Sequence, residues 1–577
     1  MADNLTFSSV IYDPGTLYAE WIVTIPPHFT GFQVVLDAAG GAAQTYEVSV
    51  PNITIEQTLE PTTDYSLTVT VMVDGQPTTQ TATVAVISSA PILTLVDNGG
   101  SSLLLQWAAA AGTGVTGYLA HLVELLVQSW TRATDAATLT TTFDMQLQTS
   151  SEYTVNVRAT GNDGVVLGPP SLVLTPITAA PTITIASNDV TEQNLWWAPA
   201  EDDGIGGYAA NLQQVSGSSW WQYTGPDELH AVFAVALDQQ YQYTVAVRAT
   251  DADVVVLGPP SQILTMITGT PVLTLVDNDG TRLTLNWAPA IGGAIEGYLA
   301  ALSQSGGQQW TVATDAGTLT AGFAEQLVVG QAYTCWVRAT GSNDVVLGPP
   351  SQILQPIAGA PTMSMVDNSG TGVRYDWAAA PGLAVDGYLA ILTQTSSSIW
   401  TESTNASTFS ATFNRQLSST EAYTSVVRAS NSNDVVLGPP SETLVPLTSS
   451  PSGPTVTTTG SQIVIGWIAD PNPAVTSYVA ELYADGTGQG SQQAPAPPAI
   501  YQQSLATGVV YTGSVRSAGN KVLGPWTAPA IGPYALDTTI RYDAYGRAVE
   551  LTWNSSSSIT YTYDDAGNIT AAQTSGT

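Results

Sequence analysis

Acidic residues recur in two turns of this chain, and their chemistry suits a hard cation. The first turn holds Asp97, Asp277, Asp279 and Asp367, and a later turn holds Asp253, Asp344 and Asp434. Calcium takes roughly six to eight oxygen ligands, largely carboxylates and carbonyls. If the two turns fall at opposite ends of the repeated unit described below, turns of neighbouring units could share a calcium ion. Asn, Asp and Gly are also what tight hairpins require, and this second interpretation stays open.

Three tryptophans lack an aromatic counterpart at the matching positions of the other repeats. They are Trp196, Trp221 and Trp336. Strand alternation places Trp196 and Trp336 on the outward side. Exposed apolar surface of this kind marks contact with a partner, so we predict partner contacts at all three. A second series, Trp130, Trp220, Trp310 and Trp400, is periodic, and we interpret it as packing over a sheet edge rather than as a sugar-stacking stripe.

The residues needed for catalysis are scattered or missing. The single cysteine, Cys335, replaces a valine on the inward side of a strand and is interpreted as a small core residue. His28, His121 and His230 lie in different units, and no G-x-S-x-G, P-loop or dinucleotide motif occurs. The sequence therefore predicts a protein that is not an enzyme and that has no cofactor, with calcium as the one ion to test.

One arginine recurs at the end of the same strand-like run in successive repeats. The positions are Arg158, Arg248, Arg338 and Arg428. The chain has only 12 basic residues against 46 acidic ones. Each of these arginines is therefore predicted to pair with a nearby carboxylate.

These residues are positioned by a unit that repeats every 90 residues. The landmarks are Trp107, Trp197, Trp287, Trp377 and Trp467, with Tyr118, Tyr208, Tyr298, Tyr388 and Tyr478 at the same step. A fixed period with matching landmarks indicates one structural unit copied in tandem. The predicted domains are residues 1–90, 91–180, 181–270, 271–360, 361–450 and 451–534, followed by a different segment, 535–577. Within 91–180, seven short β-rich runs alternate with turn residues, as in a sandwich or barrel.

The ordered landmarks resemble the fibronectin type III family. Trp107, Tyr118, Phe143 and Leu147, followed by the stretch YTVNVRATGNDGVVLGPPS, carry the resemblance. It covers residues 91–450 closely, and residues 451–534 and 1–90 more loosely. The resemblance implies an all-β chain with a tandem array of about six seven-stranded, Greek-key β-sandwiches. It also implies a spacer or binding role.

The C-terminal segment contains two copies of a different pattern. Its residues are Tyr542, Asp543, Gly546 and Arg547 in the first copy, and Tyr563, Asp564 and Gly567 in the second. The pattern resembles the YD or Rhs repeat family, whose members form spirals of β-hairpins, and it suggests a bacterial source. Two copies are too few to close a shell, so we expect a YD-type β-hairpin that packs on the sixth unit, pairs with another subunit, or is the stub of a longer array. These residues are predicted to take part in assembly.

The charge balance excludes two classes of partner. A net charge of −34 and a single lysine, Lys521, repel nucleic acid and anionic lipid. No run of 18 apolar residues occurs, so no membrane insertion is predicted. The polar, lysine-poor composition is typical of extracellular bacterial fibres and adhesins. We expect an extracellular or cell-surface location, although the N-terminus is not a recognisable signal peptide.

Together these patterns predict a non-enzymatic extracellular structural protein. Short proline-containing linkers favour a semi-rigid rod, and six units of about 30–35 Å each give a length on the order of 200 Å. The leading hypothesis is self-assembly into a fibre or an adhesive surface structure through the terminal units. The alternative is a receptor-binding or spacer arm of an Rhs-like, toxin-complex-like, injection or tail-fibre-like assembly. The partners expected are further copies of the chain and a cell-surface glycan or protein.

Overall fold

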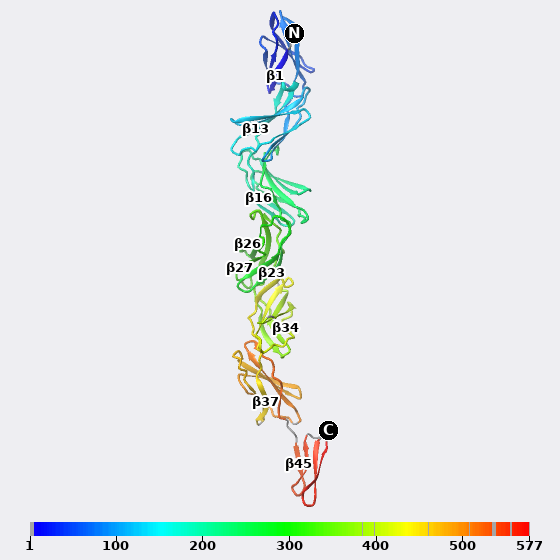
Figure 1. Ribbon diagram of the computed structural model, residues 1–577, viewed down its shortest axis with the longest axis vertical. Coiled ribbons are helices and arrows are strands. Elements are labelled where there is room, and N and C mark those ends of the chain that lie inside the picture. The colour runs from blue at the N-terminus through cyan, green and yellow to red at the C-terminus, as the bar shows by residue number, and fades with distance from the viewer. Residues whose placement is uncertain are drawn as a thin grey trace. The chain divides into compact units, whose positions relative to one another are not determined.

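The fold is all-β, as the sequence predicts. A computed structural model describes residues 5–382, 385–396, 398–459, 461–506, 508–533, 538–553 and 557–575. Within these ranges the regular elements are strands, apart from one 3-10 turn at Asn162–Gly164 (Figure 1). No helix among the described residues has the length and apolar character needed to cross a membrane.

The described chain forms two compact units. The first consists of Met1–Pro271, Ala290–Tyr298 and Arg338–Pro350, and the second of Val272–Pro289, Leu299–Val337 and Ser351–Thr577. We call the six successive segments 1–90, 91–180, 181–270, 271–360, 361–450 and 451–534 the first to sixth cassettes. The first unit holds cassettes one to three, the second holds cassettes five and six with the C-terminal segment, and the fourth cassette contributes strands to both.

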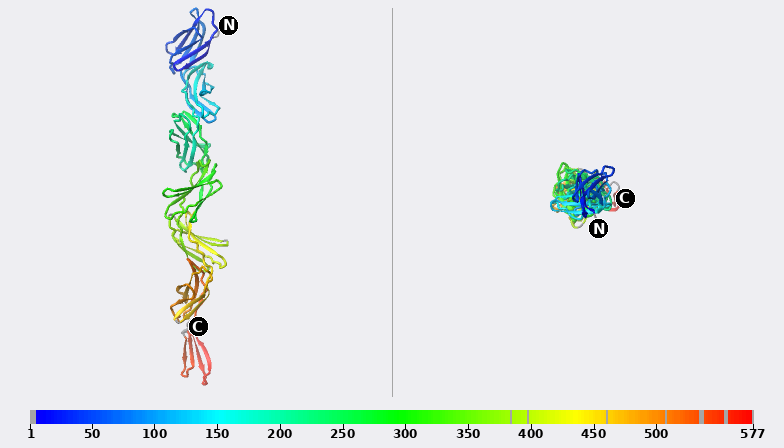
Figure 2. Two further views of the ribbon diagram at one scale, coloured as in Figure 1. Left: turned by 90° about the vertical axis from the view of Figure 1, so that its left-hand side faces the viewer. Right: turned by 90° about the horizontal axis from the view of Figure 1, so that it is seen from above.

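The first cassette is a sandwich of a three-stranded and a four-stranded sheet (blue in Figure 2). Its strands are β1 (Thr6–Asp13), β2 (Thr16–Ile22), β3 (Phe29–Ala38), β4 (Gln44–Val48), β5 (Asn52–Glu56), β6 (Tyr65–Val73) and β7 (Gln76–Val86). The order β1-β2-β5 forms one sheet and β4-β3-β6-β7 the other.

The second and third cassettes repeat this arrangement in the first unit. The second contains β8 (Ile92–Asn98), β9 (Leu103–Ala108), β10 (Gly117–Glu124), β11 (Gln128–Asp135), β12 (Thr140–Phe143), β13 (Tyr153–Gly161) and β14 (Val166–Pro170). The third contains β15 (Thr182–Asn188), β16 (Gln193–Ala198), β17 (Gly207–Gln214), β18 (Ser219–Thr224), β19 (His230–Phe233), β20 (Tyr243–Thr250), β21 (Val256–Pro260) and the short β22 (Leu264–Thr265). The stretch GYLAHLVE, which a helix could also accommodate, is the strand β10.

The later cassettes follow the same succession of strands. The fourth contains β23 (Val272–Asn278), β24 (Leu283–Ala288), β25 (Gly297–Gln304), β26 (Gln309–Asp315), β27 (Thr320–Phe323), β28 (Tyr333–Gly341) and β29 (Val346–Leu347). The fifth contains β30 (Thr362–Asn368), β31 (Val373–Ala378), β32 (Gly387–Gln394), β33 (Ile399–Asn405), β34 (Ser410–Phe413), β35 (Tyr423–Asn431) and β36 (Val436–Pro440). The sixth contains β37 (Ser452–Thr459), β38 (Gln462–Ile468), β39 (Ser477–Ala484), β40 (Thr487–Ala494), β41 (Ala499–Tyr501), β42 (Tyr511–Gly519), β43 (Val522–Leu523) and β44 (Ala530–Ile531).

The C-terminal segment forms a four-stranded antiparallel sheet, where the sequence predicted a hairpin. Its strands are β45 (Thr538–Tyr542), β46 (Ala548–Trp553), β47 (Ser557–Tyr563) and β48 (Ile569–Ser575), paired in chain order. Each sequence copy supplies one hairpin, and β46 pairs with β47 to join the two.

Alternation along the strands places apolar side chains in the cores. In β13, Tyr153, Val155 and Val157 alternate with more exposed residues and are buried. Cys335 takes the matching position in β28 and is fully buried, which confirms its interpretation as a core residue. The Trp107 and Tyr118 rings lie 5.6 Å apart in the same core.

One backbone hydrogen bond marks the same local structure in every cassette. The hydroxyl of a strand tyrosine accepts the N–H of the residue five positions upstream, which fixes the chain entry into the strand. The tyrosines, which we call corner tyrosines, are Tyr65, Tyr153, Tyr243, Tyr333, Tyr423 and Tyr511. These six bonds give a structural register for comparing cassettes whose lengths differ.

Candidate functional site: the junctions between cassettes

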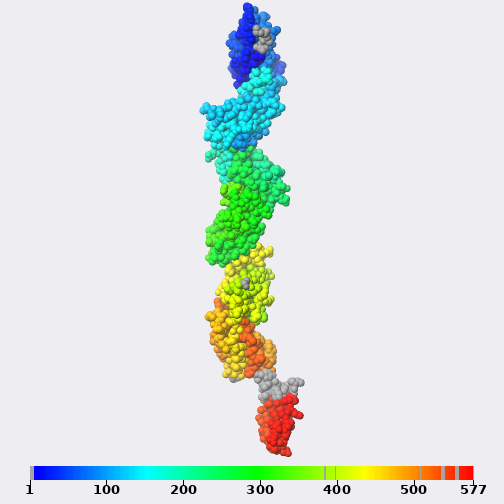
Figure 3. All heavy atoms as spheres, in the orientation of Figure 1, coloured from blue at the N-terminus to red at the C-terminus, as the bar shows by residue number. Residues whose placement is uncertain are grey.

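At the first four junctions neighbouring cassettes share a sheet, because the first strand of one pairs with the strand that follows the arginine in the next. We call this partner the last strand, although the third cassette also has the short β22 after it. β1 runs parallel to β14, with Val10 opposite Val166. The same parallel pairing joins β8 to β21, β15 to β29 and β23 to β36. At the fifth junction, Met365 donates its N–H to the carbonyl of Lys521. In the space-filling view the second and third cassettes are in direct contact (Figure 3).

An arginine fastens each junction from the side of the following cassette. Arg248, five residues after corner Tyr243, pairs with the Asp97 carboxylate of the preceding cassette. Its guanidinium also donates to the carbonyls of Asn98 and Gly258, each at 2.7 Å. Planar guanidinium groups suit this multiple recognition. The arginine therefore joins the first strand of one cassette to the last strand of the next.

The same ion pair occurs at all five junctions. The pairs are Arg158–Asp13, Arg248–Asp97, Arg338–Asp189, Arg428–Asp277 and Arg516–Asp367. This confirms the prediction that the repeated arginines pair with carboxylates. Burial lowers the pKa of Arg338. Burial also lowers the pKa of Arg516, while the Asp367 charge acts in the opposite direction.

A linker side chain packs against a glycine in the last strand of the next cassette. Ile177 is buried and lies over Gly258, where an added Cβ would come within 2.7 Å of the Ile177 Cγ2. The corresponding pairs are Ile87 with Gly168, Ile267 with Gly348, Ile357 with Gly438 and Leu447 with Gly524. Glycine in a strand often marks such a close approach. The repeated Gly-Pro-Pro sequence therefore has a packing function at the junction.

A buried asparagine ties the end of the first strand to the same linker. The Asn98 Nδ2 donates to the carbonyl of Ile177 at 2.9 Å, and its Oδ1 accepts the N–H of Gly100. Asn188, Asn278 and Asn368 make the same linker bond. A buried amide with both ends bonded avoids the cost of an unpaired polar group. This buried asparagine is therefore structural as well as part of a turn.

The third cassette forms the same ion pair, although its asparagine comes before its aspartate instead of after it. Asn188 precedes Asp189, and Ser187 takes the position that Asp97 has in the second cassette. The Asp189 Oδ1 still pairs with Arg338, and its other oxygen accepts from the Ser187 hydroxyl and the Asn194 amide. The junction therefore requires a carboxylate within reach of the arginine, and two sequence positions can supply it.

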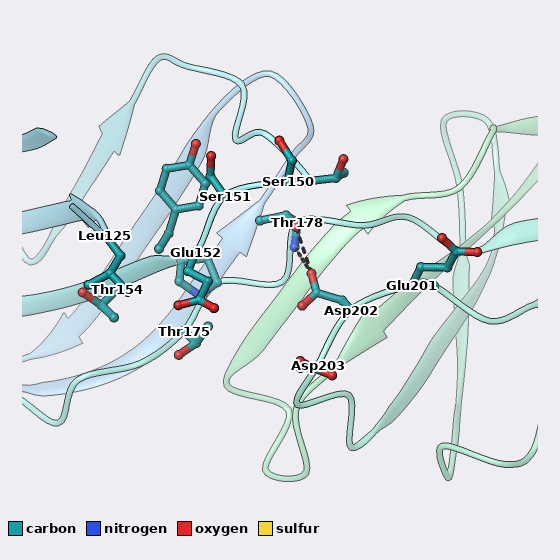
Figure 4. Close-up of a pocket in the computed structure, with 14 residues that line it drawn as sticks. Leu125, Ser150, Ser151, Glu152, Thr154, Thr175, Thr178, Glu201, Asp202 and Asp203 are labelled. Carbon is teal, nitrogen blue, oxygen red and sulfur yellow. Dashed lines mark hydrogen bonds between the residues drawn. The ribbon is translucent and has the colours of Figure 1, made fainter. Parts of the chain in front are cut away.

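A hollow of about 730 Å³ lies beside the junction of the second and third cassettes. Glu152, Glu201, Asp202 and Asp203 line it (Figure 4). The Asp202 Oδ2 accepts the Thr178 N–H at 2.6 Å and the Thr178 hydroxyl at 2.9 Å. Asp202 is therefore bonded to the linker, and the hollow belongs to the junction.

The residues predicted to bind calcium are dispersed. Asp97, Asp277 and Asp367 pair with junction arginines, whereas Asp279 accepts bonds from Thr281 and Arg282 in its own turn. Asp253, Asp344 and Asp434 are exposed in the later turns. Among the described residues, no group of three or more His, Cys, Asp or Glu side chains is arranged to hold a metal ion. Calcium binding stays a prediction, to be tested by calorimetric titration.

The unmatched tryptophans differ in their surroundings. Trp196 is 37% exposed and stacks on His230 at 4.7 Å. Trp221 is 45% exposed, and its ring is nearly parallel to that of exposed Tyr223, with the ring centroids 6.4 Å apart. Trp336 is half-buried. Of the periodic series, Trp220 and Trp400 pack on corner tyrosines, which supports the packing interpretation.

The predicted assembly residues mostly serve turns inside the C-terminal sheet. The Asp543 carboxylate accepts the N–H groups of Tyr545 and Arg547 and pairs with the Arg547 guanidinium at 2.8 Å. Asp564 repeats this with Ala566 and Asn568, and Gly546 and Gly567 take positive φ in the two turns. Hydrogen bonds from the backbone lower the pKa of Asp543 and Asp564.

Two of the predicted assembly residues are tyrosines with different exposure. Tyr563 lies under Arg547, with the guanidinium 4.6 Å from the ring centroid, and donates to the Ala548 carbonyl at 2.5 Å. Tyr542 is 57% exposed. Only the Tyr542 side chain therefore remains largely available to a partner.

The asparagines, linker isoleucines and glycines of the junctions were missed by sequence reasoning. Asp97 and Arg248 are 151 residues apart, as are Asp277 and Arg428. The 90-residue period makes the separation of 61 residues within one cassette recur equally, so the sequence alone does not distinguish the two pairings.

The strand order and the junctions define a tandem array of β-sandwiches with fibronectin type III-like topology. Among solved structures, the chain is similar to the FN1–FN3 domains of chicken CNTN1, with 19% identity over 46% of this chain and 98% of that one, at a TM-score of 0.18. It is also similar to a segment of two fibronectin type III domains from chicken tenascin, with 17% identity over 30% and 96%, at a TM-score of 0.14. Neither a family model nor a curated protein matches the chain.

Proposed function

We propose that this chain is a non-enzymatic structural protein of extracellular type, which acts as a stiff spacer. The observation that carries the proposal is the fivefold recurrence of one fastened junction. Each junction combines an Arg–Asp pair with a buried linker side chain packed on glycine. A hinge motion at any junction would break the ion pair and expose the linker side chain, so bending is opposed.

The spacer proposal is tested by small-angle X-ray scattering on the full-length chain. We expect a maximum dimension on the order of 200 Å, with little flexibility. The matched variant combines Arg248→Ala with Asn98→Ala, which releases the second junction and leaves every cassette core unchanged. A shorter, broader distance distribution for the variant supports the proposal. The same flexible profile for both proteins would contradict it.

A second candidate function is self-assembly through the C-terminal sheet. Its outer strands β45 and β48 contain neither lysine nor proline, which are residues that discourage edge pairing. Every residue of β48 is exposed. Open edges of this kind accept another strand by β-augmentation. The partner would be a second copy in a fibre or adhesive surface structure, or a larger YD-repeat protein of an Rhs-like, toxin-complex-like or tail-fibre-like assembly.

Negative-stain electron microscopy separates these outcomes. Full-length protein is compared with a chain that ends at Leu536. Filaments from the first and single particles from the second would support self-assembly through the C-terminal sheet. Single particles from both proteins would contradict self-assembly and would support the spacer role. Co-purification would then test for a larger YD-repeat partner.

The Trp221–Tyr223 pair is the proposed contact surface for a cell-surface glycan. The two exposed rings are nearly parallel and offer apolar faces, and such faces can stack on the apolar face of a pyranose ring. Glycan-array binding is compared for the natural chain and for Trp221→Ala, with Trp130→Ala in the second cassette as control. Loss of a signal only in Trp221→Ala supports the assignment, whereas equal binding by all three would contradict it.

A further inference from the structure

Each junction is built from two complementary halves. The preceding cassette supplies what we call the aspartate half: a carboxylate at the end of the first strand and the linker isoleucine or leucine, together with a buried asparagine in the second to fifth cassettes. The following cassette supplies the arginine half: the arginine five residues after the corner tyrosine, and the glycine of the last strand. A cassette that carries both halves can join a partner at each end.

The first cassette lacks the arginine half. Five residues after corner Tyr65 stands Thr70, where the second cassette has Arg158. The strand register places Gln76 and Pro77 opposite Val73 and Met72, in the positions of Val166 and Leu167. Thr78 then occupies the position of Gly168, where a side chain would collide with an incoming linker residue.

The sixth cassette lacks the aspartate half. Thr457 and Thr458 lie opposite Val464 and Ile463, in the positions that Asp97 and Asn98 take opposite Leu104 and Leu103. Both threonines are exposed. Ala530 pairs with Gly513 of β42 as Leu264 pairs with Val245 of β20. Three residues after Leu264 is the linker Ile267, whereas three residues after Ala530 is Pro533.

We infer that the junction is a directional, interchangeable connector, and that the first and sixth cassettes are caps that end the series. An interface between one surface and a different surface of the next copy grows without limit unless its ends are blocked. Terminal repeats of tandem arrays commonly serve as caps. Here each cap omits one half, so a second copy of this chain finds no complementary half at either end.

The inference is tested by restoring the missing halves in the full-length chain. One variant carries Thr70→Arg, Gln76→Val, Pro77→Leu and Thr78→Gly, and the other carries Thr457→Asp, Thr458→Asn and Pro533→Ile. Sedimentation velocity measures association. We expect each variant alone to match the natural chain, an equimolar mixture to form a complex of one copy of each, and a chain with all seven changes to form a ladder of larger species.

The specificity control replaces Thr457→Asp by Thr457→Asn in the second variant, which removes the charge and should weaken the mixed complex about tenfold. If the mixture associates no more than the natural chain while circular dichroism shows folded sandwiches, the inference is overturned. Association of the natural chain that is abolished by Arg158→Ala would overturn it as well.

A reciprocal variant tests the inference without adding residues to the caps. Asp277→Thr and Asn278→Thr give the fourth cassette the residues of the sixth. We expect proteolysis of the linker after Gln355 to rise at least about tenfold while the other linkers keep their rates. An unchanged pattern of cleavage would show that the aspartate half does not fasten the junction.

Discussion

At the residue scale, the structure gives single side chains different roles from those that composition suggests. The turn aspartates are partners of arginines, and five of the chain's 12 basic residues are used at the junctions. The prediction that these arginines pair with carboxylates followed from their scarcity. Which carboxylate is chosen could not be predicted, because the partner lies in the preceding cassette.

Arg248→Ala is expected to open the junction between the second and third cassettes. The change leaves the Asp97 carboxylate and two carbonyls without their donor, which costs about 2–3 kcal/mol for a partly buried charged group. Hydrogen exchange at the Val96 amide, which donates to the Val255 carbonyl, reports the opening. The control is Arg374→Ala, whose exposed pair with Asp376 contributes about 0–1 kcal/mol. Equal effects of the two variants would contradict this prediction.

Cys335 is expected to make stability depend on alkaline pH. Burial raises the pKa of its thiol from 9.0 to about 12. The folded state therefore favours the neutral thiol, and this contribution is full below pH 9 and is lost as pH rises from 9 towards 12. Denaturant unfolding is measured at several pH values for the natural chain and for Cys335→Val. Buried tyrosines such as Tyr501 titrate in both proteins, so the difference between them gives the contribution of the Cys335 thiol. The natural thiol should also resist a disulfide reagent at pH 8, and rapid reaction in the folded state would contradict the assignment.

At the element scale, the strands were predictable and their pairing across cassettes was not. Alternation in the stretch from Tyr153 to Val157 fixes which face is buried, and turn residues fix where strands end. Parallel pairing of β8 with β21 involves two residue pairs and leaves no periodic signal in the sequence. The C-terminal hairpins are predictable for the same reason as the strands, whereas their union through β46 and β47 requires the three-dimensional arrangement.

Gly258→Ala tests the packing of the linker on the last strand. The added methyl would overlap the Ile177 side chain, and overpacking costs about 1–3 kcal/mol. Gly225→Ala is the control, since no atom lies within 4 Å of the Cβ that it adds. The double variant Gly258→Ala, Ile177→Ala should lose less stability in thermal unfolding than the two single variants lose in sum. Strict additivity would mean that the two residues do not pack on each other.

At the scale of the whole molecule, the same Arg–Asp junction occurs five times. It lets neighbouring cassettes stay in close contact although the chain carries a net charge of −34. Like-charged surfaces repel at low salt, and each junction places one of the few cations where two cassettes meet. The fold class was predictable from the 90-residue period. The termination of the series was not, because the cap residues become informative only when the register of each strand is known.

Deletion of one complete cassette should leave a stable chain with a new, working junction. Removing residues 181–270 joins the second cassette to the fourth, so that Asp97 and Ile177 meet Arg338 and Gly348. Because the new junction combines a carboxylate with an arginine and a linker isoleucine with a glycine, as the natural junctions do, we expect a melting temperature within about 2 °C of that of the natural chain.

A double-mutant cycle of Asp97→Ala and Arg338→Ala should then give a coupling energy of about 1–3 kcal/mol in the shortened chain. The same cycle should give none in the natural chain, where Arg338 pairs with Asp189. Coupling in neither chain would mean that the cassettes are not interchangeable and that each junction depends on its own neighbours.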